Sequence, residues 1–225
     1  PTRRSSDLIS LVLGIPMGIY ASLKPNSFGA RAMMIPSLVG ISLPTFFIGI
    51  MLILYFGVEL GWLPTFGRGQ VVNVLGWPTG LLTVSGVQSI ILPAITLGLF
   101  QLTFIMRLVR AEMLEILKTD YIKFAKARGL SARKVYFGHA LKNTMIPVMT
   151  IAGLQLGSII AFGIITESVF QWPGIGLLFL QAVSTVDIPV ISAYLLLVAV
   201  IFVTVNLIVD ILYFLIDPRL RVNAS

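Results

Sequence analysis

Long apolar segments constrain the fold of this chain more than any other feature of its sequence. A helix of about 20 mainly apolar residues is long enough to cross the hydrocarbon core of a bilayer. Hydrophobic side chains make up 57% of the 225 residues and charged ones only 11%, which is not the composition of a soluble globular domain. The sequence therefore predicts an all-α polytopic membrane protein with five transmembrane helices, at residues 8–23, 33–58, 90–106, 145–166 and 188–216.

The first predicted span has sixteen residues and is short for a complete crossing, so we expect it to be truncated at its N-terminal end. The polar residues 1–7 before it differ from the rest of the chain, and we expect them to be a non-native stub. Gly14 and Gly18 in this span are spaced for close contact with a neighbouring helix. The second span is predicted to contain both Pro36 and Pro44.

The segments between the spans differ sharply in charge. Residues 59–89 form a predicted loop with Arg68 as its single base, and residues 167–187 hold two acids and no base. The only long polar segment, residues 120–147, is called the basic island here. Nine of the sixteen Lys and Arg residues lie at or just before it: Arg107, Arg110, Lys118, Lys123, Lys126, Arg128, Arg133, Lys134 and Lys142. Because cytoplasmic loops carry an excess of Lys and Arg, the island is predicted to face the cytoplasm.

The basic island is predicted to form two short helices. Thr119 or Asp120 is a plausible N-cap for the first, and Gly129 follows it where a left-handed residue is required. Ser131 offers a second N-cap for a helix that runs on toward the next span. The apolar side chains of the island either pack on the chain's own spans or form a docking surface for a soluble partner. These side chains are Tyr121, Phe124, Val135, Tyr136 and Phe137.

Several motifs carry a resemblance to a known family. They are Asp120-Tyr121-Ile122, the run from Ala125 to Ser131, the run from His139 to Asn143, Ile146-Pro147, and further motifs at 153–157, 167–170, 172–174, 206–207 and 217–219. Together they closely resemble permease subunits of ABC importers, in the dipeptide, oligopeptide and nickel branch, over nearly everything after Leu8. One motif departs from the wider superfamily: the acidic-Ala-Ala start is Lys123-Phe124-Ala125 here, so only Ala125 and Gly129 keep that pattern.

The resemblance implies a transport subunit of six spans when complete, in a bacterial or archaeal plasma membrane. It implies a permease domain over residues 8–217, a cytoplasmic tail over 218–225, and alternating access driven by separate ATPases. The implied partners are a second related permease, two cytoplasmic ATPase subunits that hold ATP and Mg²⁺, an extracytoplasmic solute-binding protein and membrane lipid. The residues implied to couple this chain to the ATPases are Tyr121, Ala125, Ala127, Arg128, Gly129, Leu130 and Ser131.

Signatures of other function classes are missing from the sequence. The chain has no phosphate-binding loop motif, so we expect it to bind no ATP and no other cofactor itself. With no Cys and one His, it has no pattern for a metal site or for an intramembrane Ser–His pair, so we expect no enzyme activity. Its bases flank apolar spans and do not form a nucleic-acid-binding domain. The remaining alternative is a self-sufficient secondary transporter or channel, which would need ionisable groups near the bilayer midplane.

Three polar residues near or inside the predicted spans are candidates for a gate or a substrate contact. Asp210 lies within the last span, where a centred charge costs about 2.5–3.5 kcal/mol, and Asn206 one turn earlier is its natural hydrogen-bond partner. Glu167 begins the second external segment. For each residue a structural role, as a hydrogen-bond partner or at a solvated helix end, stays open beside the functional one.

The distribution of bases predicts the topology. Thirteen Lys and Arg residues fall on the side of the island, whereas Arg68 alone lies between spans on the other side. A reporter that is active only in the cytoplasm should therefore work when it is fused after Lys134 or Ser225 and fail after Gly69 or Gln181. Activity of the fusion after Gly69 would contradict the assignment of the spans.

Overall fold

The computed structural model describes the backbone of residues 2–74 and 76–216. Side chains are described in the same ranges, except at residues 2–9, 39, 41, 74, 77, 152–162, 209–210 and 212–216. The chain divides into two compact units. The first comprises Pro1–Ile9, Val39–Gln101 and Ser158–Ala199, and the second comprises Ser10–Leu38, Leu102–Gly157 and Val200–Ser225.

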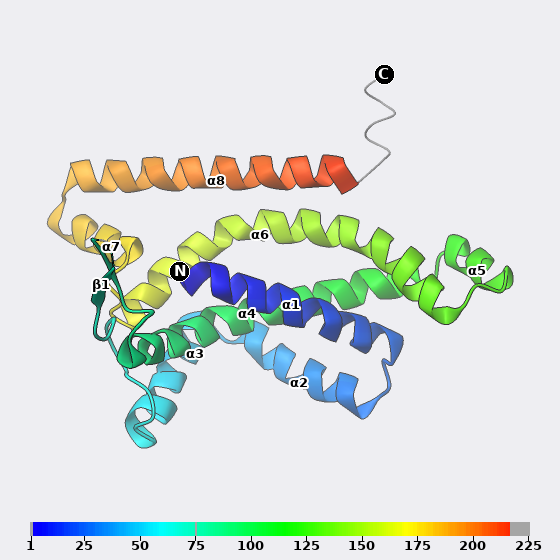
Figure 1. The fold of residues 1–225 in the computed structure, drawn as a ribbon, viewed down its shortest axis with the longest axis horizontal. Helices are drawn as coiled ribbons and strands as arrows, with labels where there is room; N and C mark the ends of the chain where they lie inside the picture. Colours follow the sequence, from blue (N-terminus) through cyan, green and yellow to red (C-terminus); the bar gives the residue numbers. More distant parts are fainter. Residues whose placement is uncertain (1, 75, 217–225) are drawn as a thin grey trace. The chain divides into compact units, whose positions relative to one another are not determined.

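Helices make up most of the described chain (Figure 1). They are α1 (Thr2–Leu23), α2 (Phe28–Ser42), α3 (Thr45–Leu52), α4 (Val84–Ile116), α5 (Asp120–Ala127), α6 (Leu141–Val169), α7 (Ile175–Thr185) and α8 (Ile188–Ile216). Two stretches are π-helical, η1 (Ile53–Glu59) and η2 (Lys134–Ala140). Two short strands, β1 (Val72–Val74) and β2 (Trp77–Thr79), pair antiparallel with Val72 opposite Thr79. The predicted helical class is therefore confirmed, with the strand pair as an addition.

Two helices among the described residues are long and apolar enough to cross a membrane, Val84–Ile116 and Ile188–Ile208. They contain the predicted spans 90–106 and the greater part of 188–216. The helix α1 begins at Thr2, so the polar residues before Leu8 continue the first predicted span as helix. The prediction that these residues are a non-native stub stays a prediction.

The segment predicted as one full span over 33–58 is interrupted in the structure. Pro36 lies inside α2, as expected, but α2 ends at Ser42 and Pro44 is the N-cap residue of α3. Pro44 has an extended ψ of 140°. Because proline has no amide proton and its ring clashes with the carbonyl four residues earlier, it ends a helix where the surrounding structure allows a bend. The expectation that Pro44 lies inside a helix is therefore wrong.

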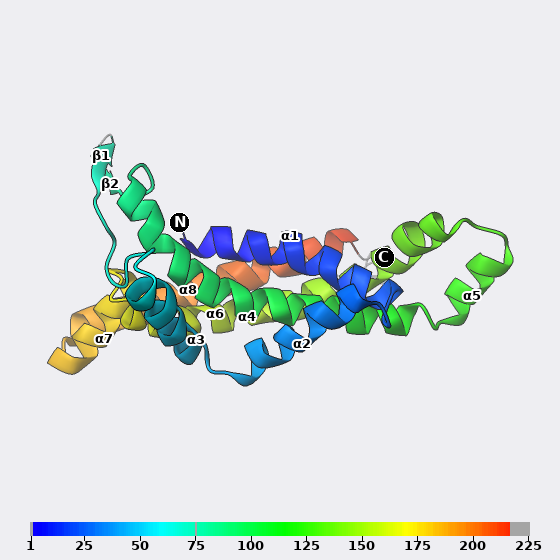
Figure 2. The same ribbon diagram turned by 90° about the horizontal axis from the view of Figure 1, so that it is seen from below.

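The predicted loop at 59–89 contains regular structure. Figure 2 shows the two strands side by side at one end of the first unit, and α4 already begins at Val84. Gly76 has φ +82° between the strands, a conformation that favours glycine. The Arg68 guanidinium donates from Nη2 to the Pro78 carbonyl oxygen at 2.7 Å, which ties the pair to the preceding chain. The prediction of a loop over residues 59–89 is therefore wrong at the two strands and at the start of α4.

Close contact between α1 and α4 organises part of the second unit. A Cβ atom on Gly18 would lie 2.7 Å from both the Met106 carbonyl oxygen and Val109 Cβ. The side chain of Val109 is fully buried in a cluster with Ile19, Ile105 and Val148. Glycine therefore lets the two helix backbones approach, as the spacing of Gly14 and Gly18 predicts.

We expect Gly18→Ala to destabilise the purified permease. The added methyl must push apart a backbone carbonyl and a buried valine, and overpacking of this kind costs about 1–3 kcal/mol. Thermal unfolding in detergent should show a lower midpoint than that of the parent. Gly138→Ala is the matched control, because a Cβ at Gly138 meets nothing within 4 Å, and its midpoint should not fall. Equal midpoints for the two variants would contradict the close α1–α4 contact.

Candidate functional site

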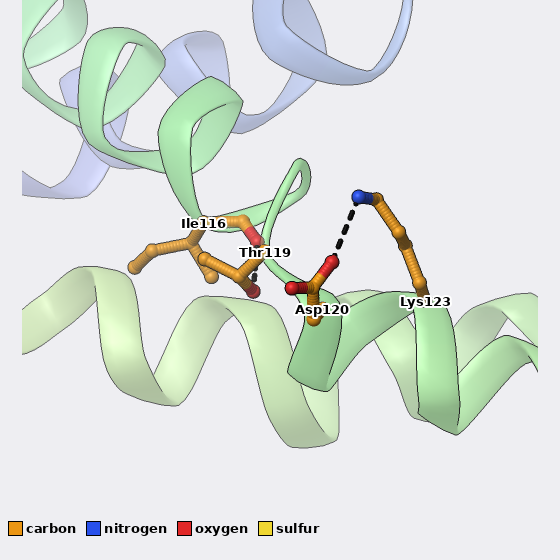
Figure 3. A network of polar contacts seen from close by, with 4 residues as sticks. All are labelled: Ile116, Thr119, Asp120 and Lys123. Carbon is orange, nitrogen blue, oxygen red and sulfur yellow. Dashed lines mark hydrogen bonds and ion pairs between the residues drawn. The ribbon is translucent and has the colours of Figure 1, made fainter.

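The start of α5 in the basic island is held by local polar contacts (Figure 3). Thr119 is the N-cap residue, with extended backbone, and its hydroxyl donates to the Ile116 carbonyl oxygen at 2.7 Å. Asp120 lies in the first turn, where its negative charge interacts favourably with the helix dipole. Its Oδ1 forms an ion pair with Lys123 Nζ at 2.8 Å. The predicted capping position is confirmed, although the Thr119 side chain bonds backward to the preceding turn and does not cap α5.

Gly129 ends α5 in the way that the sequence predicts. Its φ is +76°, and its amide donates to the Lys126 carbonyl oxygen at 2.9 Å. The Leu130 amide donates to the Ala125 carbonyl oxygen at 3.4 Å. These two bonds are the pair that defines a Schellman motif, in which a left-handed residue closes a helix and satisfies its last carbonyls. The chain then turns back along α5.

The second predicted helix of the island is not a separate element. Helical backbone begins just after Ser131, with the Val135 amide donating to the Ser131 carbonyl oxygen at 3.0 Å. It continues through η2 directly into α6, and no described residue from 132 to 141 has a positive φ. Without a glycine turn or a proline in this stretch, nothing ends the helix. The prediction of a short second helix is therefore corrected to one continuous arm.

A buried cluster joins α5 to this arm. Its buried members are Met113, Ile122, Ala125, Val135 and Ala140. Ile122 and Val135 have no exposed surface, and Leu130 and Tyr136 pack against the cluster from its edge. Burial of these side chains stabilises the hairpin of α5 and η2, because the removal of apolar surface from water is favourable.

The hairpin also has exposed aromatic side chains. Tyr121 is 50% exposed, Phe124 63% and Phe137 52%. The guanidinium carbon of Arg128 lies 5.8 Å from the centre of the Phe124 ring, within the range of a cation–π contact. The two interpretations of the island thus divide between its residues. Val135 and Tyr136 pack inward, whereas Tyr121, Phe124 and Phe137 are exposed. The outward surface of α5 that carries Phe124 and Arg128 is called the exposed aromatic face here.

The residues implied to couple the chain to an ATPase also divide by burial. Ala125 is buried and Leu130 half-buried, so both support the hairpin from inside. The others are exposed along α5 and the turn that follows it: Tyr121, Ala127, Arg128, Gly129 and Ser131.

His139 is a residue of this site that the sequence did not single out. The Tyr121 hydroxyl oxygen lies 2.5 Å from His139 Nδ1, and the two rings meet edge to face with centres 5.6 Å apart. Its signals in the sequence are that it is the single histidine and that it follows Tyr121 by 18 residues, with the predicted turn at Gly129 between them. That reversal at Gly129 is what brings the two side chains together.

Glu167, which is half-buried near the end of α6, caps the first turn of α7. Its Oε2 accepts hydrogen bonds from the amides of Gly176 at 2.7 Å and Leu177 at 3.0 Å. These amides belong to the first turn of α7, whose donors have no partners within the helix. A Cβ on Gly174 would collide with the Glu167 carboxyl group, so glycine allows the close approach. Whether Glu167 also acts as a gate stays a prediction.

The polar residues of α8 are described only in part. Asn206 is half-buried and its Nδ2 donates to the Phe202 carbonyl oxygen of its own helix at 2.9 Å. The side chain of Asp210 lies outside the described residues, so the predicted pairing of the two stays a prediction.

Comparison with solved structures shows the fold. The chain resembles a chain of the MetNI methionine ABC transporter, solved in inward-facing conformations, with a TM-score of 0.68 over 96% of this chain and 91% of that one. At 17% identity this likeness concerns the fold alone, which is a polytopic membrane fold.

Comparison with sequences identifies the family. Residues 14–222 match the model of the binding-protein-dependent transport system inner membrane component, and the chain belongs to this family. It is 41% identical, over 95% of its length and 67% of the relative, to the di/tripeptide transport system permease protein DppB of Pseudomonas aeruginosa. It is 37% identical, over 95% of its length and 68% of the relative, to the dipeptide transport system permease protein DppB of Escherichia coli K12. The chain is therefore the permease subunit of a binding-protein-dependent ABC importer, a transport component without ATPase activity of its own.

The Glu167 cap predicts a local effect on α7. Glu167→Ala removes the acceptor of two amides, and loss of a side-chain cap costs about 1 kcal/mol. Hydrogen exchange of the Gly176 and Leu177 amides should become roughly fivefold faster in the purified permease. Glu59→Ala, the loss of an exposed carboxylate in the same unit, is the control and should leave these rates unchanged. Parent-like exchange in Glu167→Ala would contradict the cap.

Proposed function

We propose that the importer carries dipeptides or short oligopeptides, and that the basic island is where this permease binds a cytoplasmic ATPase subunit. The peptide substrate is supported by the names of the relatives, which are peptide permeases at 37–41% identity over 95% of the chain. The other parts of the assembly follow the same proposal. They are a second permease, two ATPases that hold ATP and Mg²⁺, and an extracytoplasmic binding protein.

The exposed aromatic face of the island is the observation that supports the docking role. Phe124 exposes 63% of its surface beside Arg128, and Phe137 on η2 exposes 52%. Aromatic residues and Arg are enriched in protein interfaces, because both contribute large contact areas. The face lies on a hairpin with its own buried cluster, so it is a preformed surface.

The arm that carries this hairpin supports a mechanism of alternating access. The helical backbone runs from just after Ser131 through η2 and along α6 to Val169. A displacement imposed on α5 by an ATPase therefore has a continuous path into a predicted span. In this proposal, closure of the ATPases on ATP moves the hairpin and opens the substrate path outward.

The remaining architecture is proposed on the same basis. The five spans place the island and residues 218–225 in the cytoplasm of a bacterial cell. The exposed apolar side chains of α8, such as Leu196, Val203 and Leu207, suit contact with lipid and with the second permease. Asp210 and Asn206 remain candidates for a polar contact within that helix.

The proposal predicts that the purified chain depends on its partners. Alone in vesicles it should neither hydrolyse ATP nor catalyse peptide uptake, and both activities should appear when ATPases and a second permease are added. The measurements are phosphate release and uptake of a labelled dipeptide. Uptake by the chain alone, driven by an ion gradient, would favour the secondary transporter.

Substitution of Gly129 tests the docking role of the island. A Cβ at this position meets nothing within 4 Å, so the positive φ of +76° is the only obstacle to a side chain. Such a φ costs a non-glycine residue roughly 1–2 kcal/mol, and β-branching in Gly129→Val adds to this. The variant should insert normally into the membrane but bind ATPase weakly and lose substrate-stimulated ATP hydrolysis.

Gly129→Asn is the matched control, because asparagine tolerates the left-handed region and the space is open. It should keep most of the ATPase binding that Gly129→Val loses. The measurements are co-purification of the ATPase and substrate-stimulated hydrolysis by the reconstituted complex. If Gly129→Val equals the parent in both, the island is only a connector.

A further inference from the structure

We propose that the hydrogen bond between Tyr121 and His139 sets the orientation of α5, and with it the orientation of the exposed aromatic face toward the ATPase. Both residues act by positioning, because the bond holds the face in place. The inference rests on the proposed docking function and deepens it.

The first step of the argument is that burial decides which face of α5 is turned inward but leaves a small rotation of the helix about its axis open. The helix has eight residues, and its buried side chains in the cluster are Ile122 and Ala125. Hydrophobic contact is non-directional, so a small rotation of α5 about its axis keeps these two side chains covered. A rotation of that kind nevertheless moves Phe124 and Arg128 on the other face.

The second step is that one directional contact prevents this rotation. Tyr121 lies at the edge between the two faces of α5, and its hydroxyl reaches His139 Nδ1 on η2 at 2.5 Å. Among the described residues, the Tyr121–His139 contact is the one side-chain hydrogen bond between α5 and another element. The Lys123–Asp120 pair lies within α5. In either neutral tautomer of the imidazole, Nδ1 and the hydroxyl can share one proton as donor and acceptor.

The third step is that the pair connects α5 to the helical arm through which a displacement can reach α6. His139 lies in η2, which continues without a break into α6. The ring of Tyr121 also packs edge to face on the imidazole, with an angle of 75° between the ring planes. The pair therefore ties the docking helix to the arm that enters the membrane, at a point distinct from the Gly129 turn.

Variants of the pair test the proposal in the assembled importer, reconstituted in nanodiscs. Tyr121→Phe removes the hydroxyl and keeps the ring, and His139→Phe removes the nitrogen and keeps an aromatic side chain. A net hydrogen bond corresponds to about a 2- to 10-fold change in equilibrium, so each variant should raise the Kd for the ATPase by that factor. The double variant should be no worse than either single variant, because the shared bond is already lost.

Rescue and a matched control separate positioning from general damage. In His139→Asn the side-chain amide stands as many bonds from Cα as Nδ1 does, so it should restore the Kd to within about twofold. The rescue should fail in the background of Tyr121→Phe. Tyr136→Phe removes a hydroxyl on the same arm that makes no hydrogen bond among the described residues, and it should match the parent.

Two results would overturn the proposal. One is a Kd for Tyr121→Phe equal to that of Tyr136→Phe, and the other is additive losses in the double variant. Gly129→Val distinguishes this failure from failure of the docking function. If Gly129→Val weakens binding while Tyr121→Phe does not, the docking function stands without the tie. If both bind ATPase as the parent does, the docking function itself fails.

Discussion

The small buried cluster beneath α5 is the contact on which the candidate docking surface depends. An isolated helix of eight residues is not stable in water, because nucleation of a helix fixes several residues before hydrogen bonds compensate for the lost entropy. Ile122 and Ala125 gain stability only by packing on Met113, Val135 and Ala140. These partners come from the end of α4 and from the arm that leads into α6, so the cluster decides which face of α5 is turned outward. Phe124 is exposed because Ile122 and Ala125 occupy the buried face of the same helix.

Short helices at two places in the chain are both fixed by devices at their ends. The helix α5 is closed by the Schellman motif at Gly129, where glycine takes a φ of +76° without strain. The helix α7 is opened by Glu167, whose carboxylate accepts two amides of the first turn. Hydrogen bonds at the helix ends thus stabilise both short helices, and buried side chains also stabilise α5.

The failures of sequence reasoning have identifiable causes. Pro44 was expected inside a span because membrane helices tolerate proline, but tolerance depends on neighbours that a sequence does not reveal. The strand pair at 72–79 was missed because three residues a strand are too few to show an alternating pattern. The island was divided into two short helices, yet only Gly129 carries a turn signal, and η2 continues into α6. His139 was passed over because its partner is 18 residues away.

The sequence by itself determined the membrane class, the family and the turn at Gly129. Hydropathy, motifs and the conformational freedom of glycine are properties of neighbouring residues, so they can be read without a fold. Only the tertiary structure decided that Val135 is buried while Phe124 is exposed, that Glu167 caps α7, and that Tyr121 meets His139. Each of these depends on which surfaces meet after the chain reverses, and that is settled by packing between elements distant in the sequence.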